Sequence, residues 1–355
     1  MSNRRARVIV FWLFTIGCVA GAIGYVRWRP VPHAQPPVSS AGASSPAVSL
    51  LDPANASVRA TIDTLRTSPH ITFLSTRTDA PGHIGFAALD KPEAVSIIDG
   101  PECERSHFGK DLGLCLALNR ESMEPRAFAL ILDNHFQPLA RFPMAGLPIR
   151  ARVSRDQRYA AATVFVTGEN YSSDFTTRTT IIDLAARRPI ATLEEFTVER
   201  DGRPYHAVDF NFWGVTFFQD GNRFYATLGT GGKRLLVEGN IARKQMRVAG
   251  TDVECPSLSP DERHIVFKRK LSTGPGWGLW AKNLSSGEAW AITDEGQDID
   301  DQVEWLDNEH VVYGRLFGHG APETSLSLWT SRIARQPTFD QQLFLRSASS
   351  PSVIR

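Results

Sequence analysis

The sequence predicts an all-β protein, a six-bladed β-propeller, that follows an N-terminal segment of different composition. Three observations support this prediction. A polar turn centred on an aspartate recurs along the chain, six pairs of strand-like runs follow in step with it, and the last residues read as one more strand. With 355 residues the chain can form one large domain. Its 42% hydrophobic and 22% charged residues are ordinary for a globular protein.

Residues 1–29 read as a membrane anchor or signal segment. Three arginines precede Val8–Val26, a run of 19 uncharged residues. As a transmembrane helix this run just spans a hydrocarbon core of about 30 Å. Only two arginines follow it, which favours the N-terminus inside the cell. A cleaved signal peptide and a lipoprotein modified at Cys18 remain alternatives, and all three export the rest of the chain.

Residues 30–50 read as a disordered linker rich in proline, serine and alanine. Such a stretch has too few apolar residues to form a core, and its prolines stiffen it. We therefore expect a single-pass protein of a bacterial inner membrane. A folded domain, residues 51–355, would lie on the periplasmic side, with the short helix Val58–Arg66 ahead of the first blade.

The repeat is centred on aspartates at the tips of predicted hairpin turns. Its clearest copy is Leu258–Phe267, where a polar turn leads into an apolar strand. Successive turn aspartates lie 45, 64, 41 and 46 residues apart. Spacings in the forties suit one four-stranded blade, whereas the alternative, a β-sandwich, requires no such repeat. The aspartates are Asp111, Asp156, Asp220, Asp261 and Asp307.

Two departures from the regular spacing have simple interpretations. The longest spacing contains the charged stretch Glu194–Val208, which we interpret as a loop between blades. Each blade is expected to have four strands, and the sequence shows six third strands and six fourth strands but only five aspartate turns. We explain the missing turn by a first blade that begins at its second strand, Ile71–Ser75. Ser350–Arg355 resembles an inner strand. We therefore expect the C-terminal strand to complete the first blade and close the ring.

The segment Cys255–Arg263 resembles the repeat of TolB-like propellers, in which a P-x-h-S-P-D-G turn precedes an apolar strand. Leu279 with Trp280, and Thr293 at the blade's end, fit the same family pattern. Of the turn aspartates, only Asp220 keeps the family's following glycine. The resemblance implies a propeller from about Ile71 onward. TolB's additional N-terminal α/β domain has no counterpart here, so TolB's own partners are not implied.

The sequence lacks recognisable catalytic motifs. It contains neither a G-x-S-x-G elbow nor a nucleotide-binding glycine fingerprint, and Gly229–Lys233 reads as a hairpin turn. No histidine or cysteine pair has zinc spacing, and the acidic run Asp294–Asp301 lacks the order of a calcium loop, although calcium remains an alternative there.

The 39 basic and 38 acidic side chains argue against nucleic acid as a partner. We expect a monomer without enzyme activity, cofactor or metal.

Cys103 and Cys115 are candidates for a disulfide. They fall on the predicted first and second strands of the second blade, on either side of the Asp111 turn. Antiparallel neighbours come within disulfide reach, and an exported domain permits the bond. Cys255 would remain a free, buried thiol.

A ligand of the propeller would be expected at the mouth of its central funnel, where the inner strands begin. Charged residues with one tryptophan suit a peptide or a small polar ligand there, and equally an ordinary solvated rim. The function we predict is a non-enzymatic protein-interaction scaffold in the cell envelope, with envelope proteins as partners. The alternative is a small-ligand sensor or propeller hydrolase that uses the funnel. The candidate residues are Arg105, Arg150, Trp213, Glu254 and Asp301.

Overall fold

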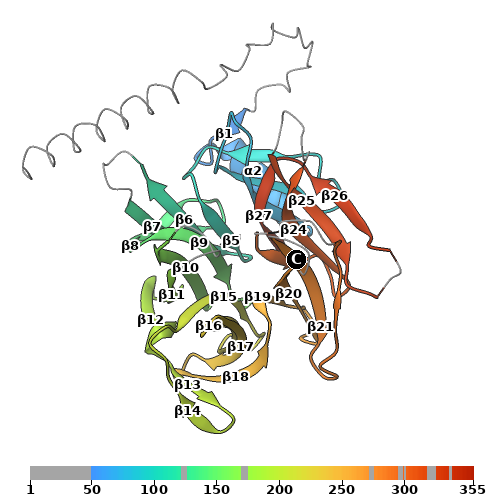
Figure 1. Cartoon of the computed structure of the whole chain (residues 1–355). Coiled ribbons are helices and arrows are strands. Elements are labelled where there is room, and N and C mark those ends of the chain that lie inside the picture. The colour runs from blue at the N-terminus through green and yellow to red at the C-terminus, as the bar shows by residue number, and fades with distance from the viewer. Residues whose placement is uncertain are drawn as a thin grey trace, which may run out of the picture. The chain divides into compact units, whose positions relative to one another are not determined.

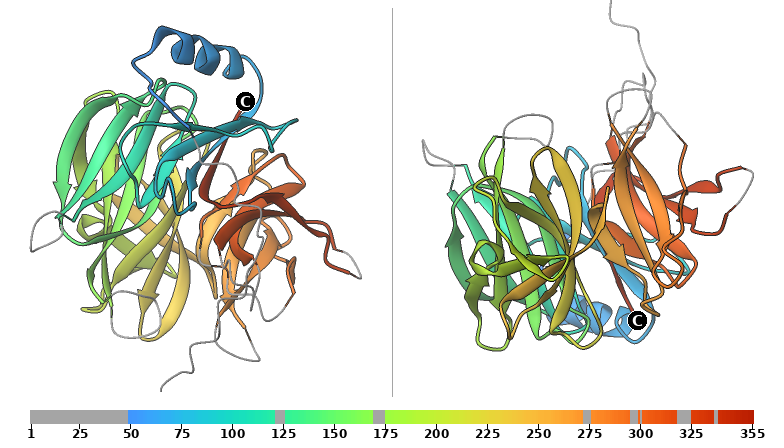
Figure 2. Two further views of the ribbon diagram at one scale, coloured as in Figure 1. Left: turned by 90° about the horizontal axis from the view of Figure 1, so that it is seen from above. Right: turned by 60° about the horizontal axis from the view of Figure 1, so that its bottom comes forward.

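Six β-sheets are arranged as blades around a central axis in the computed structural model (Figures 1 and 2), which confirms the predicted propeller. The structure describes residues 49–120, 126–168, 175–271, 276–294, 299, 301–317, 325–335 and 338–355. The predicted anchor and nearly all of the predicted linker lie outside these residues. Among the described residues, no helix is long and apolar enough to span a membrane.

Four blades are regular four-stranded antiparallel sheets, with strands ordered from the axis to the perimeter. Blade 2 contains β5 (Arg105–Phe108), β6 (Leu112–Asn119), β7 (Arg126–Asp133) and β8 (Pro138–Met144). Blade 3 contains β9 (Leu147–Val153), β10 (Tyr159–Thr167), β11 (Thr176–Asp183) and β12 (Arg188–Thr192). Blade 5 contains β19 (Glu254–Leu258), β20 (His264–Lys270), β21 (Trp277–Asn283) and β22 (Ala289–Ala291). Blade 6 contains β23 (Val303–Trp305), β24 (His310–Phe317), β25 (Ser325–Arg332) and β26 (Gln341–Leu345).

Blade 1 is assembled from both ends of the domain. The C-terminal β27 (Ala348–Ile354) is its inner strand and pairs antiparallel with β2 (His70–Ser75). β3 (Ile84–Ala88) and β4 (Ser96–Ile98) follow, and β1 (Leu50–Leu51) pairs parallel with β4 at the outer edge. The predicted closure of the ring by the C-terminal strand is therefore confirmed.

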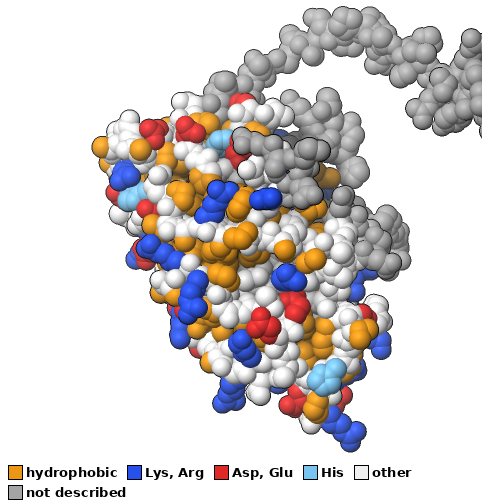
Figure 3. Space-filling view, turned by 90° about the vertical axis from the view of Figure 1, so that its left-hand side faces the viewer, with side chains coloured by type: hydrophobic (Ala, Val, Ile, Leu, Met, Phe, Trp, Pro, Cys, Tyr) orange, Lys and Arg blue, Asp and Glu red, His pale blue; other side chains and the backbone are white. Residues whose placement is uncertain are grey.

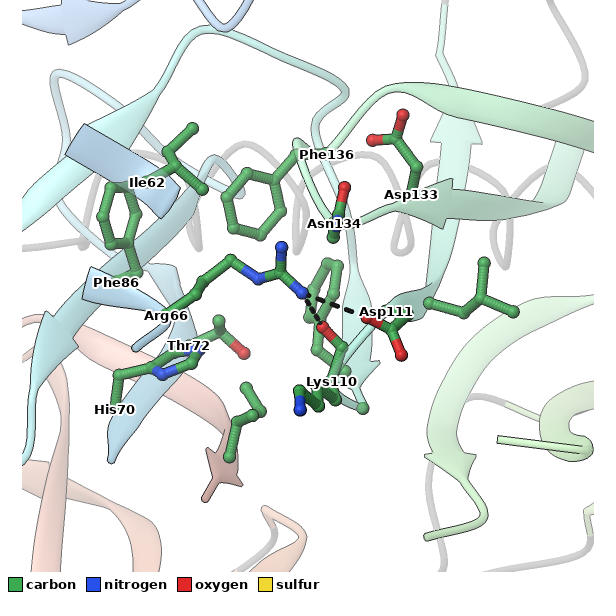
Figure 4. Close-up of a pocket in the computed structure, with 14 residues that line it drawn as sticks. Ile62, Arg66, His70, Thr72, Phe86, Lys110, Asp111, Asp133, Asn134 and Phe136 are labelled. Carbon is green, nitrogen blue, oxygen red and sulfur yellow. Dashed lines mark hydrogen bonds and ion pairs between the residues drawn. The ribbon is translucent and has the colours of Figure 1, made fainter. Parts of the chain in front are cut away.

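The predicted short helix is also confirmed, as α2 (Ala56–Leu65). Its N-cap residue Asn55 accepts the backbone N–H of Ser57 at 2.9 Å. Ile62 is buried in the apolar cluster between blades 1 and 2. At the helix end, Arg66 reaches the carbonyl of Lys110 and the Asp111 carboxylate (Figure 4). A pocket of only about 20 Å³ remains under the helix.

Blade 4 corrects the interpretation of Glu194–Val208 as a loop. This stretch forms most of the 3₁₀ turn η1 (Leu193–Glu195) and the hairpin β13 (Thr197–Arg200) and β14 (Arg203–Tyr205). The hairpin extends a sheet of β15 (Asn211–Phe217), β16 (Arg223–Thr230), β17 (Lys233–Asn240) and β18 (Gln245–Thr251), because β13 pairs parallel with β18. Phe196 and Val198 are buried between blades 3 and 4, so two apolar residues within a charged stretch fix the hairpin.

Gly231 and Gly232 form the predicted hairpin turn between β16 and β17, with φ of 55° and 72°. Both values lie in the left-handed region that glycine adopts without strain. The sequence Gly229–Lys233 is therefore confirmed as a turn between two strands.

The apolar core is a ring of clusters, each lying between neighbouring blades. One cluster joins Leu114 and Ile131 of blade 2 to Ile182 of blade 3. Another joins Phe224 of blade 4 to Ile181 of blade 3. A fully buried side chain of this size contributes about 1.5–3 kcal/mol. Each blade is therefore stabilised chiefly by the faces of its two neighbours.

The aspartate turns add polar links between blades. In blade 3, Ser154 Oγ donates to Asp156 Oδ1 at 2.6 Å and accepts the Tyr159 N–H at 3.0 Å. The next residue, Gln157, has a φ of 55°, at the position where the family repeat has glycine. Its side chain reaches blade 2, where Gln157 Oε1 accepts the backbone N–H groups of Asp111 and Leu112 at 2.6 and 2.7 Å. Gln157 therefore accepts a strained conformation and links two blades.

Glu262 of blade 5 repeats this arrangement two blades further along. Its φ is 59°, and its Oε1 accepts the N–H of Gln219 in blade 4 at 2.5 Å. The loss of the family glycine at these two turns thus coincides with new contacts between blades.

Replacing Gln157 with alanine should lower the free energy of unfolding by about 1–3 kcal/mol. The substitution leaves two backbone N–H groups without their acceptor and keeps the positive φ. Gln157→Gly should cost less, because glycine relieves the strained backbone. Urea unfolding of the two variants checks this order of stability. A glycine variant less stable than the alanine variant would contradict the strain assigned to the backbone of Gln157.

Candidate functional site

The central channel is lined by polar side chains that link neighbouring blades. His107 Nδ1 in blade 2 accepts the backbone N–H of Val153 in blade 3 at 3.1 Å. Ser352 and Thr216 accept the equivalent N–H groups from the blades that follow theirs, both at 3.1 Å. This contact occurs at three junctions of the described structure, and one residue of each inner strand occupies the matching position. These residues are Ser352, His107, Arg152, Thr216, Ser257 and Glu304.

Three of these side chains, from blades 2, 3 and 6, form a buried ion cluster. Glu304 Oε2 accepts hydrogen bonds from His107 Nε2 at 2.9 Å and from Arg152 Nη1. Arg152 Nη2 donates to the carbonyl oxygen of Val303 at 2.9 Å, and the Trp305 N–H donates to Glu304 Oε1 at 3.0 Å. No side chain of the three is more than 12% exposed. The cluster therefore links blade 6 to blades 2 and 3 across the axis.

The hydrogen bonds determine which nitrogen of His107 carries the proton. Nδ1 accepts from the backbone of Val153, so the proton lies on Nε2 and points to Glu304. Burial, together with the charge of Arg152, lowers the pKa of His107 below its ordinary value of 6.5. His107 is therefore neutral at pH 7.

Glu304 is the anion of the cluster. Burial raises the pKa of its carboxyl group, but Arg152 and the hydrogen bond from His107 outweigh that effect and bring the pKa to about 2. One positive and one negative charge therefore face each other beside a neutral imidazole, and the cluster has no net charge. This arrangement suits a structural contact, since each polar group already has its partner.

A small cavity lies beside the cluster. It has a volume of about 10 Å³ and is lined by Arg150, Arg152, Gly214, Cys255 and Gln302, among others. That volume is close to the minimum that holds one water molecule. Gln302 Nε2 donates to the carbonyl of Ser106 at 3.1 Å, which closes the wall between blades 6 and 2.

Two of the predicted mouth residues form part of the channel wall. Arg105 Nε donates to the carbonyl of Ile149 at 3.0 Å, and Arg150 Nη1 donates to the same carbonyl at 2.7 Å. Arg150 is 4% exposed. These two arginines therefore lie together and link blades 2 and 3.

The other three predicted residues are also buried. Glu254 lies 3.4 Å from Arg234 Nε, and the Arg234 guanidinium lies 5.1 Å from the ring of Trp213. Asp301 accepts the N–H groups of Ser350 and Gln302 at 2.8 and 2.9 Å. The structure thus brings Trp213 and Glu254 together around Arg234 and places Asp301 at the junction of blades 6 and 1.

Sequence reasoning missed His107, Arg152 and Glu304. Serine occupies this level in two blades and the other four blades each have a different residue, so no repeat motif marks it. One signal was available, because His107 and Arg152 lie two residues after the candidates Arg105 and Arg150. Side chains two residues apart share a face of a strand, so both residues could have been placed beside the axis.

The structure also describes the candidate disulfide and part of the acidic run Asp294–Asp301. Cys103 and Cys115 form a disulfide with their Cα atoms 5.5 Å apart, and Cys255 is a free, buried thiol. Of the acidic run, Glu295, Asp298 and Asp300 lie outside the described residues. Within the described part, no three histidine, cysteine or acidic side chains are grouped so that they could hold a metal ion.

A wider hollow, of about 680 Å³, lies on the outer part of blade 4. The inserted hairpin forms part of its wall, and β16, β17 and β18 supply most of the rest. Within it Glu238 pairs with Arg247 and lies 3.7 Å from Arg223, while the exposed Arg243 has no ion pair in the described structure. This hollow, which we call the blade 4 groove, is far larger than the axial cavity.

Comparison with solved structures agrees with this architecture. TolB from Acinetobacter baumannii superimposes with a TM-score of 0.55 and 14% identity, over 81% of this chain and 67% of TolB. The chain has the TolB-like propeller fold. A chain of a nidogen/laminin complex has a TM-score of 0.51 and 10% identity, over 81% of this chain and 98% of its own. No family model and no curated protein matches the sequence. These similarities establish the fold of the chain alone, because proteins with this fold have many different functions.

The free energy of unfolding should fall as the pH drops below about 6.5. The unfolded chain binds a proton at the ordinary histidine pKa of 6.5, whereas folded His107 resists protonation until a lower pH. Glu304 adds to the loss between its ordinary pKa of 4.5 and about 2. His107→Asn offers an acceptor to Val153 without titrating, so urea unfolding of this variant should depend less on pH between 6.5 and 5. Equal slopes for the variant and the native protein would contradict this role.

Removing only the acidic partner of the cluster should be costly. Glu304→Gln leaves the buried Arg152 without its counter-charge, which should cost about 3–5 kcal/mol of unfolding free energy. The double variant Arg152→Met with Glu304→Gln should be less destabilised than the single variant, because no unpaired charge is then buried. Urea unfolding of the native protein and of these variants measures the differences in unfolding free energy. A double variant less stable than Glu304→Gln would show that the unpaired charge of Arg152 is not the cause of the destabilisation.

Proposed function

We propose that this protein is a non-enzymatic interaction scaffold of the bacterial cell envelope. In this proposal the N-terminal segment, residues 1–29, holds the chain at the inner membrane, and the linker places the TolB-like propeller on the periplasmic side. The charge-free run Val8–Val26 supports the anchor. The Cys103–Cys115 bond supports an oxidising compartment, where disulfides persist.

The small cavity beside the channel cluster is the observation that most favours a scaffold. Ligand pockets for small molecules are typically about 300–1,000 Å³, whereas the cavity beside the His107 cluster has about 10 Å³. The charged groups around it are already engaged with one another. Recognition would then use the outer surface, where the blade 4 groove has about 680 Å³ and the inserted hairpin supplies part of its wall. Insertions in repeat folds often supply binding surfaces.

A small-ligand sensor or propeller hydrolase remains the alternative. It would require Arg105, Arg150, Glu254 and Asp301 to receive a ligand at the mouth. Within the described residues these side chains bond to backbone groups or to Arg234, so a ligand would have to displace contacts that stabilise the ring.

Photo-crosslinking of the full chain in cells tests the proposal. A benzophenone amino acid in place of the exposed Arg243 should capture an envelope protein in the blade 4 groove. The same amino acid at the exposed Lys91, in the β3–β4 turn of blade 1, serves as the matched control and should give no such adduct.

Thermal unfolding completes this test. Absence of any specific adduct at Arg243, together with a midpoint raised several degrees by a metal ion or a small polar molecule, would favour the sensor or hydrolase and contradict the scaffold.

A further inference from the structure

Each blade ends at the perimeter in an outer strand, whose free edge can in principle pair with a strand of another chain. Most of these edges are protected, because proline lacks the N–H that pairing requires and a very short strand offers few groups. Prolines lie in β8, β12 and β14, while β1 and β22 have only two and three residues. The edge of β26 differs, since its five residues include neither a proline nor a charged side chain.

The pairing within blade 6 shows which way β26 directs its backbone groups. The Ile333 N–H donates to the Glu309 carbonyl at 2.8 Å, which fixes the alternation of hydrogen bonds along β25. By this alternation Thr330 bonds toward β26 and not toward β24. Its register partner in β26 is Gln342, so the backbone of Gln342 bonds inward to β25.

The two neighbours of Gln342 therefore direct their N–H and C=O groups away from the sheet. These neighbours are Gln341 and Leu343, and the pairing with β25 is regular across all three residues. A bulge falls only at the next residue, Phe344. Because β26 is the last strand of its sheet, at the perimeter of the ring (Figures 1 and 2), the outward groups form an open edge.

The side chains along this edge are neutral and partly apolar. Leu343 and Phe344 are partly buried, and Phe339, two residues before the strand, is 40% exposed. By contrast, charged side chains are spread over the side of the molecule that blades 2 and 3 form (Figure 3). An open, neutral strand edge beside an exposed aromatic ring is typical of sites where strands of two chains associate.

A second copy of this chain fits the edge. In an antiparallel pair about a two-fold axis, the residue at the axis meets itself, so a charged residue there would be repelled. With the axis at Gln341 two neutral amides meet, and Phe339 of each copy lies opposite Leu343 of the other. Asp340 then lies opposite Gln342 of the second copy, so no like charges face each other. The outward backbone groups of the two copies also meet in the order that an antiparallel ladder requires.

We propose that two copies of this chain associate through β26, antiparallel about Gln341, so that blade 6 of each copy joins one continuous sheet. The protein then pairs, whereas the sequence led us to expect a monomer. One pair of short strands buries less than the roughly 1,200 Å² of a stable interface. The pairing therefore rests on the anchored scaffold described above, because two copies in one membrane meet at a raised effective concentration. Blade 4 takes no part, so the pair presents two blade 4 grooves.

Cysteine crosslinking in native membranes tests the pairing. The full chain carries Cys18→Ser, which leaves the buried Cys255 as its one native free thiol. Gln341→Cys places the two introduced cysteines in a hydrogen-bonded pair, with Cα atoms about 5.5 Å apart and so within disulfide reach. Oxidation with copper phenanthroline should convert most of this variant into a disulfide-linked dimer.

A matched control and a second pair of variants test the register. Thr338→Cys is exposed and lies three residues earlier, about 20 Å from its counterpart in the proposed pair, so its dimer yield should be about tenfold lower. Phe339→Cys and Leu343→Cys should each fail to crosslink alone but should crosslink when both chains share one membrane. This pair keeps the contact of Gln341 with the Tyr313 hydroxyl, so it still tests the pairing if Gln341→Cys folds poorly.

The outcomes separate the pairing from the anchor. A chain absent from the membrane fraction would overturn the anchor, and the pairing with it. A membrane-bound chain that gives equal dimer yields for Gln341→Cys and Thr338→Cys, or no dimer in either experiment, would overturn the pairing alone. A disulfide from Gln341→Cys to a different protein, in place of the dimer, would show that another partner uses this edge and would also overturn the pairing.

Discussion

Contact between each blade and the next is the constraint on which this propeller depends. A single four-stranded blade has two apolar faces and cannot bury either by itself, so the clusters that make up the core lie between blades. Polar groups reinforce the same junctions at two levels. Gln157 and Glu262 link the turns, and His107, Arg152 and Glu304 link the inner strands. Closure by β27 then leaves no blade without a neighbour.

The sequence predicted what the repeat encodes. Turn aspartates, strand periodicity and the strand-like C-terminus identified the six blades and the closure, because each depends on a local pattern. The hairpin in Glu194–Val208 was missed, since Phe196 and Val198 are too few to reveal a strand pair amid charged residues. The channel cluster was missed for a different reason. It joins residues from three blades, and its chemistry arises only when the ring brings them together.

The contacts between blades across the channel bear on where this protein can act. A ring held together through its own channel gains cohesion between blades but gives up the usual place for a small ligand. Binding would then fall to the perimeter, where the blades differ most. Blade 4, for example, carries an inserted hairpin and a wide groove.

The state of His107 tests the central claim most directly, because its two nitrogens report both contacts of the channel cluster. Nitrogen-15 NMR of the histidine side chains distinguishes a protonated ring nitrogen from an unprotonated one. We predict that His107 carries its proton on Nε2, accepts at Nδ1, and gains a second proton only at a pH below the ordinary histidine pKa of 6.5. Titration of His107 with the ordinary histidine pKa of 6.5 would show an open, hydrated channel and contradict this account.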